Sequence, residues 1–281
     1  MKTLLALALI TLFAAPFDLP KQMKKTYTYV PSGNVVLEGE EVSVQSFYMA
    51  KTEVTHAEYN QFLSWLKENG TEEEQQEARI RNENWVKRNY PQEKYGEHYH
   101  THEAYLDYPV VNVSHKAAQM YCDWLTTKLN ATIDGQNLKF RLPFRAEFIK
   151  AGSSSASTQE YAWNEGSLKD AKGVARANFV RVLQSQLTHD DEGNITVVPA
   201  EASDDPETGV DLMAPSQSYE AYSYGFHNLN GNVAEMVAEE GVAVGGSWND
   251  LGYDIRLRSK ATYGESACDV GFRPAFTVVK E

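Results

Sequence analysis

Three histidines, His98, His100 and His102, alternate along the segment GEHYHTHEAY. In an extended strand this spacing places all three imidazoles on one face, a geometry that can hold zinc or another transition metal. A metal site also needs partners that orient each imidazole, and the sequence around this segment identifies none. We therefore favour the interpretation that the three histidines lie in a solvated polar loop.

The chain has two cysteines, Cys122 and Cys268, so it can form at most one internal disulfide. Two cysteines are too few for a disulfide scaffold. The 281 residues are 42% hydrophobic and 23% charged, a composition that excludes a wholly disordered chain. This length favours one large domain or two modest ones. The formal net charge of -13 repels phosphate backbones and argues against nucleic acid as a partner.

The N-terminus has the pattern of a secretory signal. Met1 and Lys2 precede the apolar run TLLALALITLFAAPF, which ends near small residues. The run is shorter than the roughly 20 apolar residues that span a bilayer, and polar residues follow it at once. We expect residues 1–20 to be a cleaved signal peptide, with its boundary left open because Pro16 disfavours a cut after Ala15. The protein is then exported to the periplasm, the cell surface or the extracellular space, without a transmembrane anchor.

The first part of the mature chain predicts strands and then a helix. Alternating runs between residues 27 and 54 are typical of short hairpins. The segment THAE, which begins at Thr55, is typical of a capping box at a helix start, and Gly70 can end that helix. The polar residues 71–90 run from acidic to basic, which predicts a further helix on the surface.

The second part predicts two more helices and a long irregular region. Ser114 is a suitable N-cap for a helix whose apolar stripe includes Cys122, which we expect to be a buried, unreactive thiol. A short strand and a helix from Pro143 to Gly152 follow. Residues 153–220 are rich in Ser, Asp, Gly and Pro and predict irregular structure.

Five segments occur in the order that is found in one protein family. They are FYMAKTEVTHAEYNQFL, YPVVNVSHKAAQMYCDWL, FRLPFRAEF, GFHNLNGNVAEM, and finally VGGSWND with VGFRPAF. They resemble the segments F-x-I-x-x-x-E-V-T-N, P-V-x-x-V-S-W, R-L-P-T-E-A-E-W, G-N-V-W-E-W, R-G-G-S-W and G-F-R of the formylglycine-generating enzyme, or sulfatase-modifying factor, family. The resemblance covers residues 27–277. It implies a single irregular α+β domain with a C-type-lectin-like core, little regular secondary structure, and here a helical insertion at about residues 68–105.

The resemblance also shows where this chain departs from the family. Members that make formylglycine oxidise a substrate cysteine with oxygen, using copper held by two cysteines three and eight residues after the serine of the G-G-S motif. Those positions are Asp250 and Ile255 here, and no cysteine lies between Gly246 and Ala267. Because a cuprous ion needs thiolate ligands, we expect no copper, no catalytic residue and no other bound cofactor of that chemistry.

Calcium is the one ion that the resemblance implies for this chain. In HNLNGNVAE the family pattern gives as ligands the Asn228 side chain, the Gly231 and Val233 carbonyls and the Glu235 carboxylate, all oxygen donors of the kind that calcium prefers. The alternative interpretation is a polar Asn-Gly turn, which explains Gly231 but does not require Glu235.

Further positions of the family pattern are occupied by polar residues. A second implied calcium site begins at Asn178 and takes a carboxylate from residues 204–211, where Asp205 and Asp211 compete. The resemblance also implies buried, paired guanidiniums with a structural role at Arg141, Arg256, Arg258 and Arg273.

From these patterns we expect an exported, calcium-stabilised pseudoenzyme that binds a protein or glycan partner, or builds an assembly, in the cell envelope. Its insertion is similar to that of Bacteroidota envelope proteins of gliding motility and type IX secretion. Those relatives are lipoproteins, whereas no cysteine precedes Cys122 here. The alternative is an oxidoreductase of the same family that modifies a protein or peptide through a different metal site.

Overall fold

The computed structural model describes residues 19–87, 96, 98–133, 137–154, 158–180, 187–189, 195–197 and 213–279. The helices are α1 (Met23–Thr26), α2 (His56–Asn69), α3 (Glu72–Glu77), α4 (Asn84–Lys87), η1 (Glu103–Tyr105), α6 (His115–Asn130) and α7 (Arg145–Gly152). The strands of the first half are β1 (Tyr27–Val30), β2 (Gly33–Leu37), β3 (Glu40–Val44), β4 (Phe47–Ala50) and β5 (Asn137–Arg141). Those of the second half are β6 (Leu187–His189), β7 (Ile195–Val197), β8 (Ala234–Met236), β9 (Val242–Val244), β10 (Lys260–Thr262), β11 (Val270–Gly271) and β12 (Ala275–Val279).

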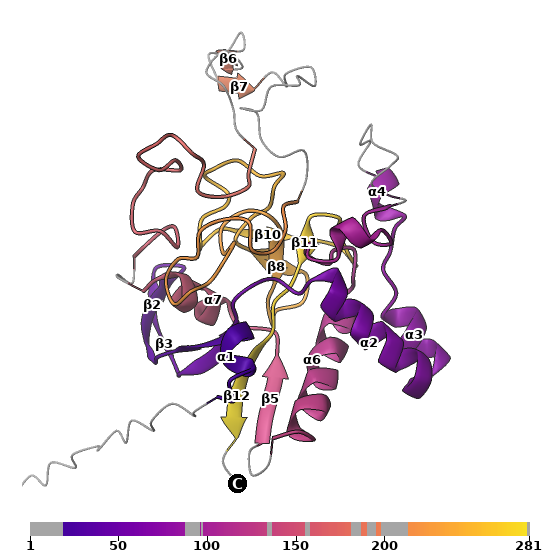
Figure 1. The fold of residues 1–281 in the computed structure, drawn as a ribbon. Coiled ribbons are helices and arrows are strands. Elements are labelled where there is room, and N and C mark those ends of the chain that lie inside the picture. Colours follow the sequence, from indigo (N-terminus) through magenta and orange to yellow (C-terminus); the bar gives the residue numbers. More distant parts are fainter. Residues whose placement is uncertain are drawn as a thin grey trace, which may run out of the picture.

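Two small sheets carry the fold, and they bring the two ends of the domain together. The first sheet has the order β1-β4-β12-β5, so the last strand lies between two strands from the first half of the chain. The second has the order β10-β9-β8-β11, in which β11 is parallel to β8. Figure 1 shows β12 beside β5 and α6 alongside them. The short strands and few helices confirm the predicted α+β class.

The predicted helix starts are confirmed. Thr55 caps α2, because its hydroxyl accepts the Glu58 amide at 3.3 Å while the Glu58 carboxylate accepts the Thr55 amide at 2.9 Å. Ser114 caps α6 by accepting the Ala117 amide at 3.0 Å. Both caps satisfy amides that have no partner within the first turn of a helix. Gly70 ends α2 and Gly152 ends α7, whereas α7 begins at Arg145 and leaves Pro143 just outside it.

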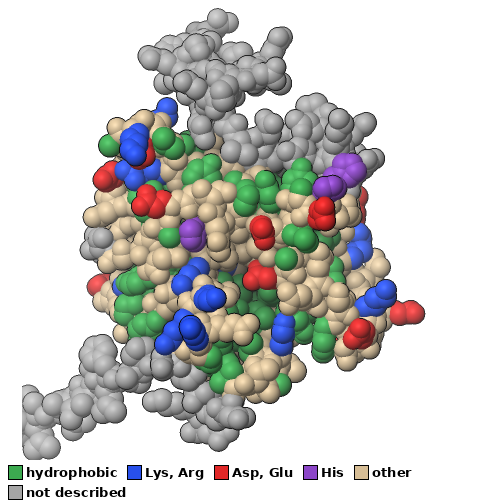
Figure 2. All heavy atoms as spheres, viewed as in Figure 1, with side chains coloured by type: hydrophobic (Ala, Val, Ile, Leu, Met, Phe, Trp, Pro, Cys, Tyr) green, Lys and Arg blue, Asp and Glu red, His purple; other side chains and the backbone are tan. Residues whose placement is uncertain are grey.

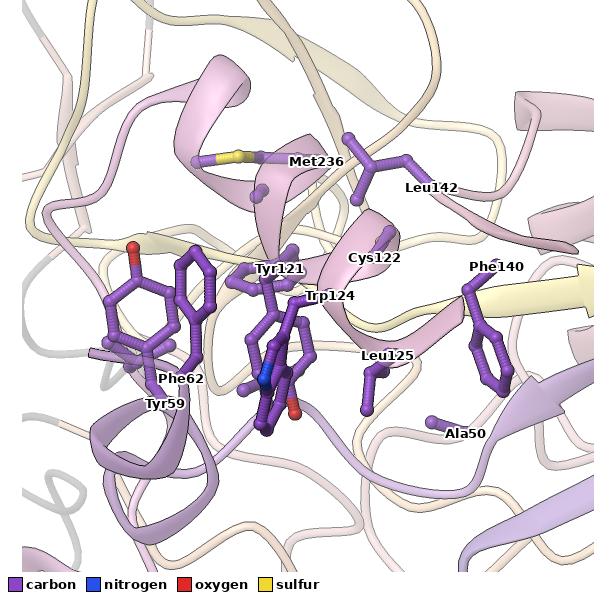
Figure 3. Packing of buried hydrophobic residues seen from close by; sticks show 14 of the residues in the cluster. Ala50, Tyr59, Phe62, Tyr121, Cys122, Trp124, Leu125, Phe140, Leu142 and Met236 are labelled. Atoms are coloured by element: carbon purple, nitrogen blue, oxygen red, sulfur yellow. The ribbon is translucent and has the colours of Figure 1, made fainter. Parts of the chain in front are cut away.

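Aromatic side chains from α2 and α6 fill the space between these two helices. The rings of Phe62 and Tyr121 meet edge to face with centroids 5.7 Å apart, and Tyr59 stacks on Tyr121 at 5.9 Å. Figure 3 shows these rings together with Trp124 and Cys122 of the same cluster. The Cys122 side chain is buried, and burial raises the pKa of its thiol well above the usual range, as expected for an unreactive core residue.

The polar residues 71–90 do not form the predicted surface helix. Over the described part of this segment, α3 ends at Glu77, a non-helical stretch follows, and α4 begins at Asn84. Arg81 and Trp85 are buried, and the Arg81 guanidinium pairs with Glu265 at 2.7 Å. These tertiary contacts override the charge order, because a continuous surface helix would leave Trp85 in solvent. No helix of the described residues is long and apolar enough to cross a membrane.

Candidate functional site

Arg273 lies at the centre of a buried polar cluster, which we define as Glu53, Asn228, Asn232, Glu235 and Arg273. Its guanidinium forms a bidentate ion pair with Glu235, in which Nε donates to Oε2 and Nη2 to Oε1, both at 2.6 Å. The two side chains are 0% and 1% exposed. The guanidinium also donates to the carbonyl oxygens of Ala50, Lys51 and His227. Arg273 therefore connects β8, the end of β4 and the loop before β8. Its burial and pairing confirm the predicted buried guanidinium at this position.

Glu53 adds a second carboxylate to this cluster. It is fully buried, Oε1 accepts Nδ2 of Asn232 at 2.8 Å, and Oε2 accepts Nδ2 of Asn228 at 3.2 Å. Burial raises the pKa of Glu53, and the positive charge of Arg273 opposes that rise only in part. Two carboxylates thus share one guanidinium. Sequence reasoning missed Glu53, although a carboxylate directly after an apolar strand is a signal that it needs an internal partner.

The loop that contains HNLNGNVAE holds the four residues that the family resemblance gives as calcium ligands, and its one carboxylate, Glu235, is already paired. Both oxygens of Glu235 accept hydrogen bonds from Arg273, so its negative charge already has a cation. Asn228 fits a ligand better, because its Oδ1 atom is buried without a hydrogen-bond partner. Calcium takes six to eight oxygen donors. With Glu235 engaged by Arg273, the implied set is reduced to the Asn228 amide oxygen and the carbonyls of Gly231 and Val233, which is fewer. The arrangement fits Arg273, and not calcium, as the counter-charge of Glu235. Calcium remains a prediction from the resemblance.

The other predicted calcium ligands lie beside the Arg273 cluster. The Asn232 amide donates to the Asn178 carbonyl at 2.8 Å, and Gly231 packs against the same carbonyl. Val233 is buried in the turn before β8. The carboxylates proposed to complete a site with Asn178, at positions 205 and 211, lie outside the described residues.

The two positions that hold copper in the family serve packing and turn formation here. The Ser247 amide and hydroxyl donate to Oδ2 of Asp250 at 2.8 and 2.6 Å, so Asp250 closes the turn after the G-G-S motif. Ile255 is fully buried in an apolar cluster with Tyr161 and Trp163. The cysteines at 122 and 268 belong to two different core clusters and form no disulfide. These residues do not fit a two-thiolate copper site, because carboxylate and aliphatic groups do not replace thiolates around a cuprous ion.

The remaining predicted arginines are paired but more exposed. Arg141 forms a bidentate pair with Glu147, with both distances 2.6 Å. Arg256 pairs with Glu160 and stacks on Tyr253 at 3.3 Å from the ring centroid. Arg258 donates to main-chain carbonyls, including that of Val36 at 3.1 Å. Each of these contacts joins segments that are distant in sequence or fixes a turn, which is the predicted structural role.

The three alternating histidines do not share one environment. His98 and His102 are exposed, and histidine side chains are visible at the surface on the side of α4 (Figure 2). His100 is buried and contacts His56 and Trp85, so the predicted solvated loop is wrong for this residue. Nδ1 of His102 accepts the Ala104 amide, which conflicts with the protonated Nδ1 of a neutral imidazole that binds a metal through Nε2. Over the described ranges, no group of three or more His, Cys, Asp or Glu side chains is arranged to hold a metal.

The chain belongs to the family of sulfatase-modifying factor enzyme 1-like domains, whose model matches residues 13–278. Three solved structures illustrate the fold. CarF has a TM-score of 0.53 at 20% identity, with 89% of this chain and 97% of that chain covered. PvdO from Pseudomonas aeruginosa has a TM-score of 0.56 at 15% identity (89% and 93% covered), and Treponema denticola variable protein 1 has 0.56 at 17% identity (89% and 94% covered). No curated protein sequence matches the chain significantly. At these identities the structures are similar in fold alone.

Proposed function

We propose that the chain is an exported, non-catalytic domain that binds a protein or glycan partner, or builds an assembly, in the cell envelope. The observation that carries the proposal is the use of the two copper-ligand positions. Asp250 closes a turn and Ile255 fills the core, so both side chains are committed to the fold. A chain with this arrangement retains the scaffold of the family without its metal chemistry.

Rigid loops support a binding role. The segments that contain residues 158–180 and 213–233 have little regular structure, yet side chains hold them in place. Nδ2 of Asn230 donates to the Ile255 carbonyl at 2.6 Å, and its Oδ1 accepts the Ala162 amide at 2.8 Å. Loops that a scaffold holds in one conformation are common sites of recognition, because little conformational entropy is lost on binding.

The first prediction is that the protein generates no formylglycine. Incubation with copper, a reductant, oxygen and a Cys-x-Pro-x-Arg peptide should leave the peptide cysteine unconverted, because the two thiolate ligands are missing. Mass spectrometry detects the aldehyde directly. A no-protein sample that receives the same copper is the control. Aldehyde above that background, together with stoichiometric copper or iron in the purified protein, would instead support an oxidoreductase with a different metal site.

The second prediction concerns export. The apolar N-terminal run should direct secretion and be removed, so the intact mass of the protein from its native host should lack at least residues 1–15. Fractionation of the same cells should place the shortened protein outside the cytoplasm. A mature mass that still includes Met1 would contradict cleavage, and a full-length protein in the cytoplasmic fraction would contradict export.

A further inference from the structure

A buried chain of hydrogen bonds connects the insertion to the first turn of α2. Nε1 of Trp85 donates to Nε2 of His100 at 3.3 Å, and Nδ1 of His100 lies 2.8 Å from Nε2 of His56. Nδ1 of His56 lies 2.8 Å from the Tyr105 carbonyl oxygen. Bulk water barely reaches this hydrogen-bond chain, because the exposed fractions are 2% for His56, 5% for Trp85 and 8% for His100.

The donor at one end of this hydrogen-bond chain and the acceptor at the other fix the position of every proton in it. The indole N–H of Trp85 can only donate, so Nε2 of His100 is unprotonated and Nδ1 carries the proton. That proton is donated to Nε2 of His56, whose own proton is then on Nδ1 and is donated to the Tyr105 carbonyl. Both imidazoles are therefore neutral. A further proton on either ring would place two N–H groups against each other in a buried site.

Trp85, at one end of this hydrogen-bond chain, directly follows Asn84, which lines a cavity of about 300 Å³. Arg81, Glu83 and Asn84 of the insertion line one side, and residues 264–268 line the other. Two side-chain contacts cross between the sides, from Arg81 to Glu265 at 2.7 Å and from Nδ2 of Asn84 to the Ser266 hydroxyl at 2.6 Å.

Cys268 lies on the side of this cavity opposite Arg81, Glu83 and Asn84. Cys268 is 1% exposed and shares an apolar cluster with Trp85 and Tyr99, both of which belong to the insertion. Displacement of these two rings removes part of the cover of the thiol, the rest of which comes from Val111, Met213, Val233 and Trp248 of the same cluster. Cys122 lies in a different cluster, which is built mainly from α2, α6 and the two sheets and includes neither Trp85 nor Tyr99.

We propose that the hydrogen-bond chain Trp85–His100–His56 is an acid-sensitive latch, which holds the rings of Trp85 and Tyr99 over Cys268 and releases them when the imidazoles are protonated. The lowered pKa values of the two imidazoles give the direction of the pH dependence. Burial lowers the pKa of His56 to about 4 and that of His100 well below its usual value, the latter with a contribution from His56. In the released state both rings regain their ordinary pKa, so the latched state loses stability as the pH falls below about 6.5.

Among the described residues, no carboxylate acts on the pKa of either imidazole. The ring of Tyr99 packs against both imidazoles and against the ring of Tyr105, and the Tyr99 hydroxyl donates to the Pro109 carbonyl. The charged groups on the insertion side of the cavity are Glu83, which pairs with Arg79, and Arg81 with its partners Glu77 and Glu265. Acid also protonates carboxylates, so the experiment has to separate the two histidines from these ion pairs.

Thiol labelling of the full chain tests the latch. Dithiodipyridine reacts with thiols in acid, and peptide mass spectrometry distinguishes Cys268 from Cys122. We expect the rate at Cys268, normalised to a free thiol at each pH, to rise by more than the roughly 50-fold that His56 alone contributes between about pH 7 and about pH 4.5, with Cys122 protected throughout. His100→Gln keeps one donor and one acceptor without a titratable charge, so it should reduce the rise to the part that comes from His56. The matched control His98→Gln changes an exposed histidine of the same turn and leaves Arg81 untouched, so it should behave like wild type.

Three outcomes would overturn the latch. They are a flat pH profile at Cys268, simultaneous exposure of both cysteines, and a His100→Gln profile identical to that of wild type. If His100→Gln weakens folding, imidazole NMR of the wild type decides the question. The His56 and His100 ring signals should start to titrate at the same pH at which Cys268 becomes reactive, and titration at an ordinary histidine pKa without labelling would contradict the proposal.

Discussion

Arg273→Met is expected to reduce the free energy of unfolding by about 3–5 kcal/mol, because it leaves the carboxylate of Glu235 buried without its cation. The same change removes the donors to the carbonyl oxygens of Ala50, Lys51 and His227. For a domain of this size the melting temperature should fall by roughly 10 °C or more. Arg79→Met is the matched control, because its ion pair with Glu83 is 41% and 51% exposed and should contribute little.

A double-mutant cycle separates the ion pair from the other contacts of Arg273. Glu235→Gln alone should also be strongly destabilising, whereas Arg273→Met combined with Glu235→Gln should cost clearly less than the sum of the two. Chelation of calcium should lower the wild-type melting temperature by less than Arg273→Met does, because Glu235 already has a counter-charge. Additive single variants would argue against the ion pair. A fall on chelation as large as that of Arg273→Met would restore calcium as the stabilising cation.

The parts of the fold that depend on local chemistry could be predicted. The capping box at Thr55 and the N-cap at Ser114 each act through the amide three residues further on, so a short stretch of sequence contains the whole interaction. The apolar spacing on α6 likewise placed Cys122 in the core. Residues 71–90 show the limit of such reasoning. Their charge order predicts a helix, but contacts of Arg81 and Trp85 with distant segments decide the conformation.

The polar cluster was predictable only in part, for the same physical reason. The motif positions identified Asn228, Glu235 and Arg273 as buried or liganding residues, but the pairing of Glu235 with Arg273 depends on β8 and β11 lying side by side. Glu53 reaches this cluster from a position 175 residues before Asn228. Separations of this kind leave no trace in residue spacing. His56 and His100, 44 residues apart, could not be paired from the sequence for the same reason.

Gly231→Ala is expected to destabilise the domain by roughly 3 kcal/mol or more, through two effects that add. Gly231 has a φ of +76°, a conformation that costs a residue with a side chain about 1–2 kcal/mol. A Cβ atom there would also lie 2.2 Å from the Asn178 carbonyl oxygen, which is main chain and cannot rotate away. The contact would separate this carbonyl from the Asn232 amide, which donates to it at 2.8 Å. Urea denaturation followed by circular dichroism measures the loss.

Gly241→Ala separates the two effects. Gly241 has nearly the same φ, +74°, but the nearest atom to an added Cβ is the Tyr263 carbonyl oxygen at 3.6 Å, an ordinary contact. This variant should therefore show the conformational cost alone, about 1–2 kcal/mol. The difference between the two variants measures how closely the loop with Asn228 and Glu235 is held against Asn178. Equal losses would mean that the close approach is absent in solution, and Asn178 would then have room for a ligand, such as a cation, between its carbonyl and the loop.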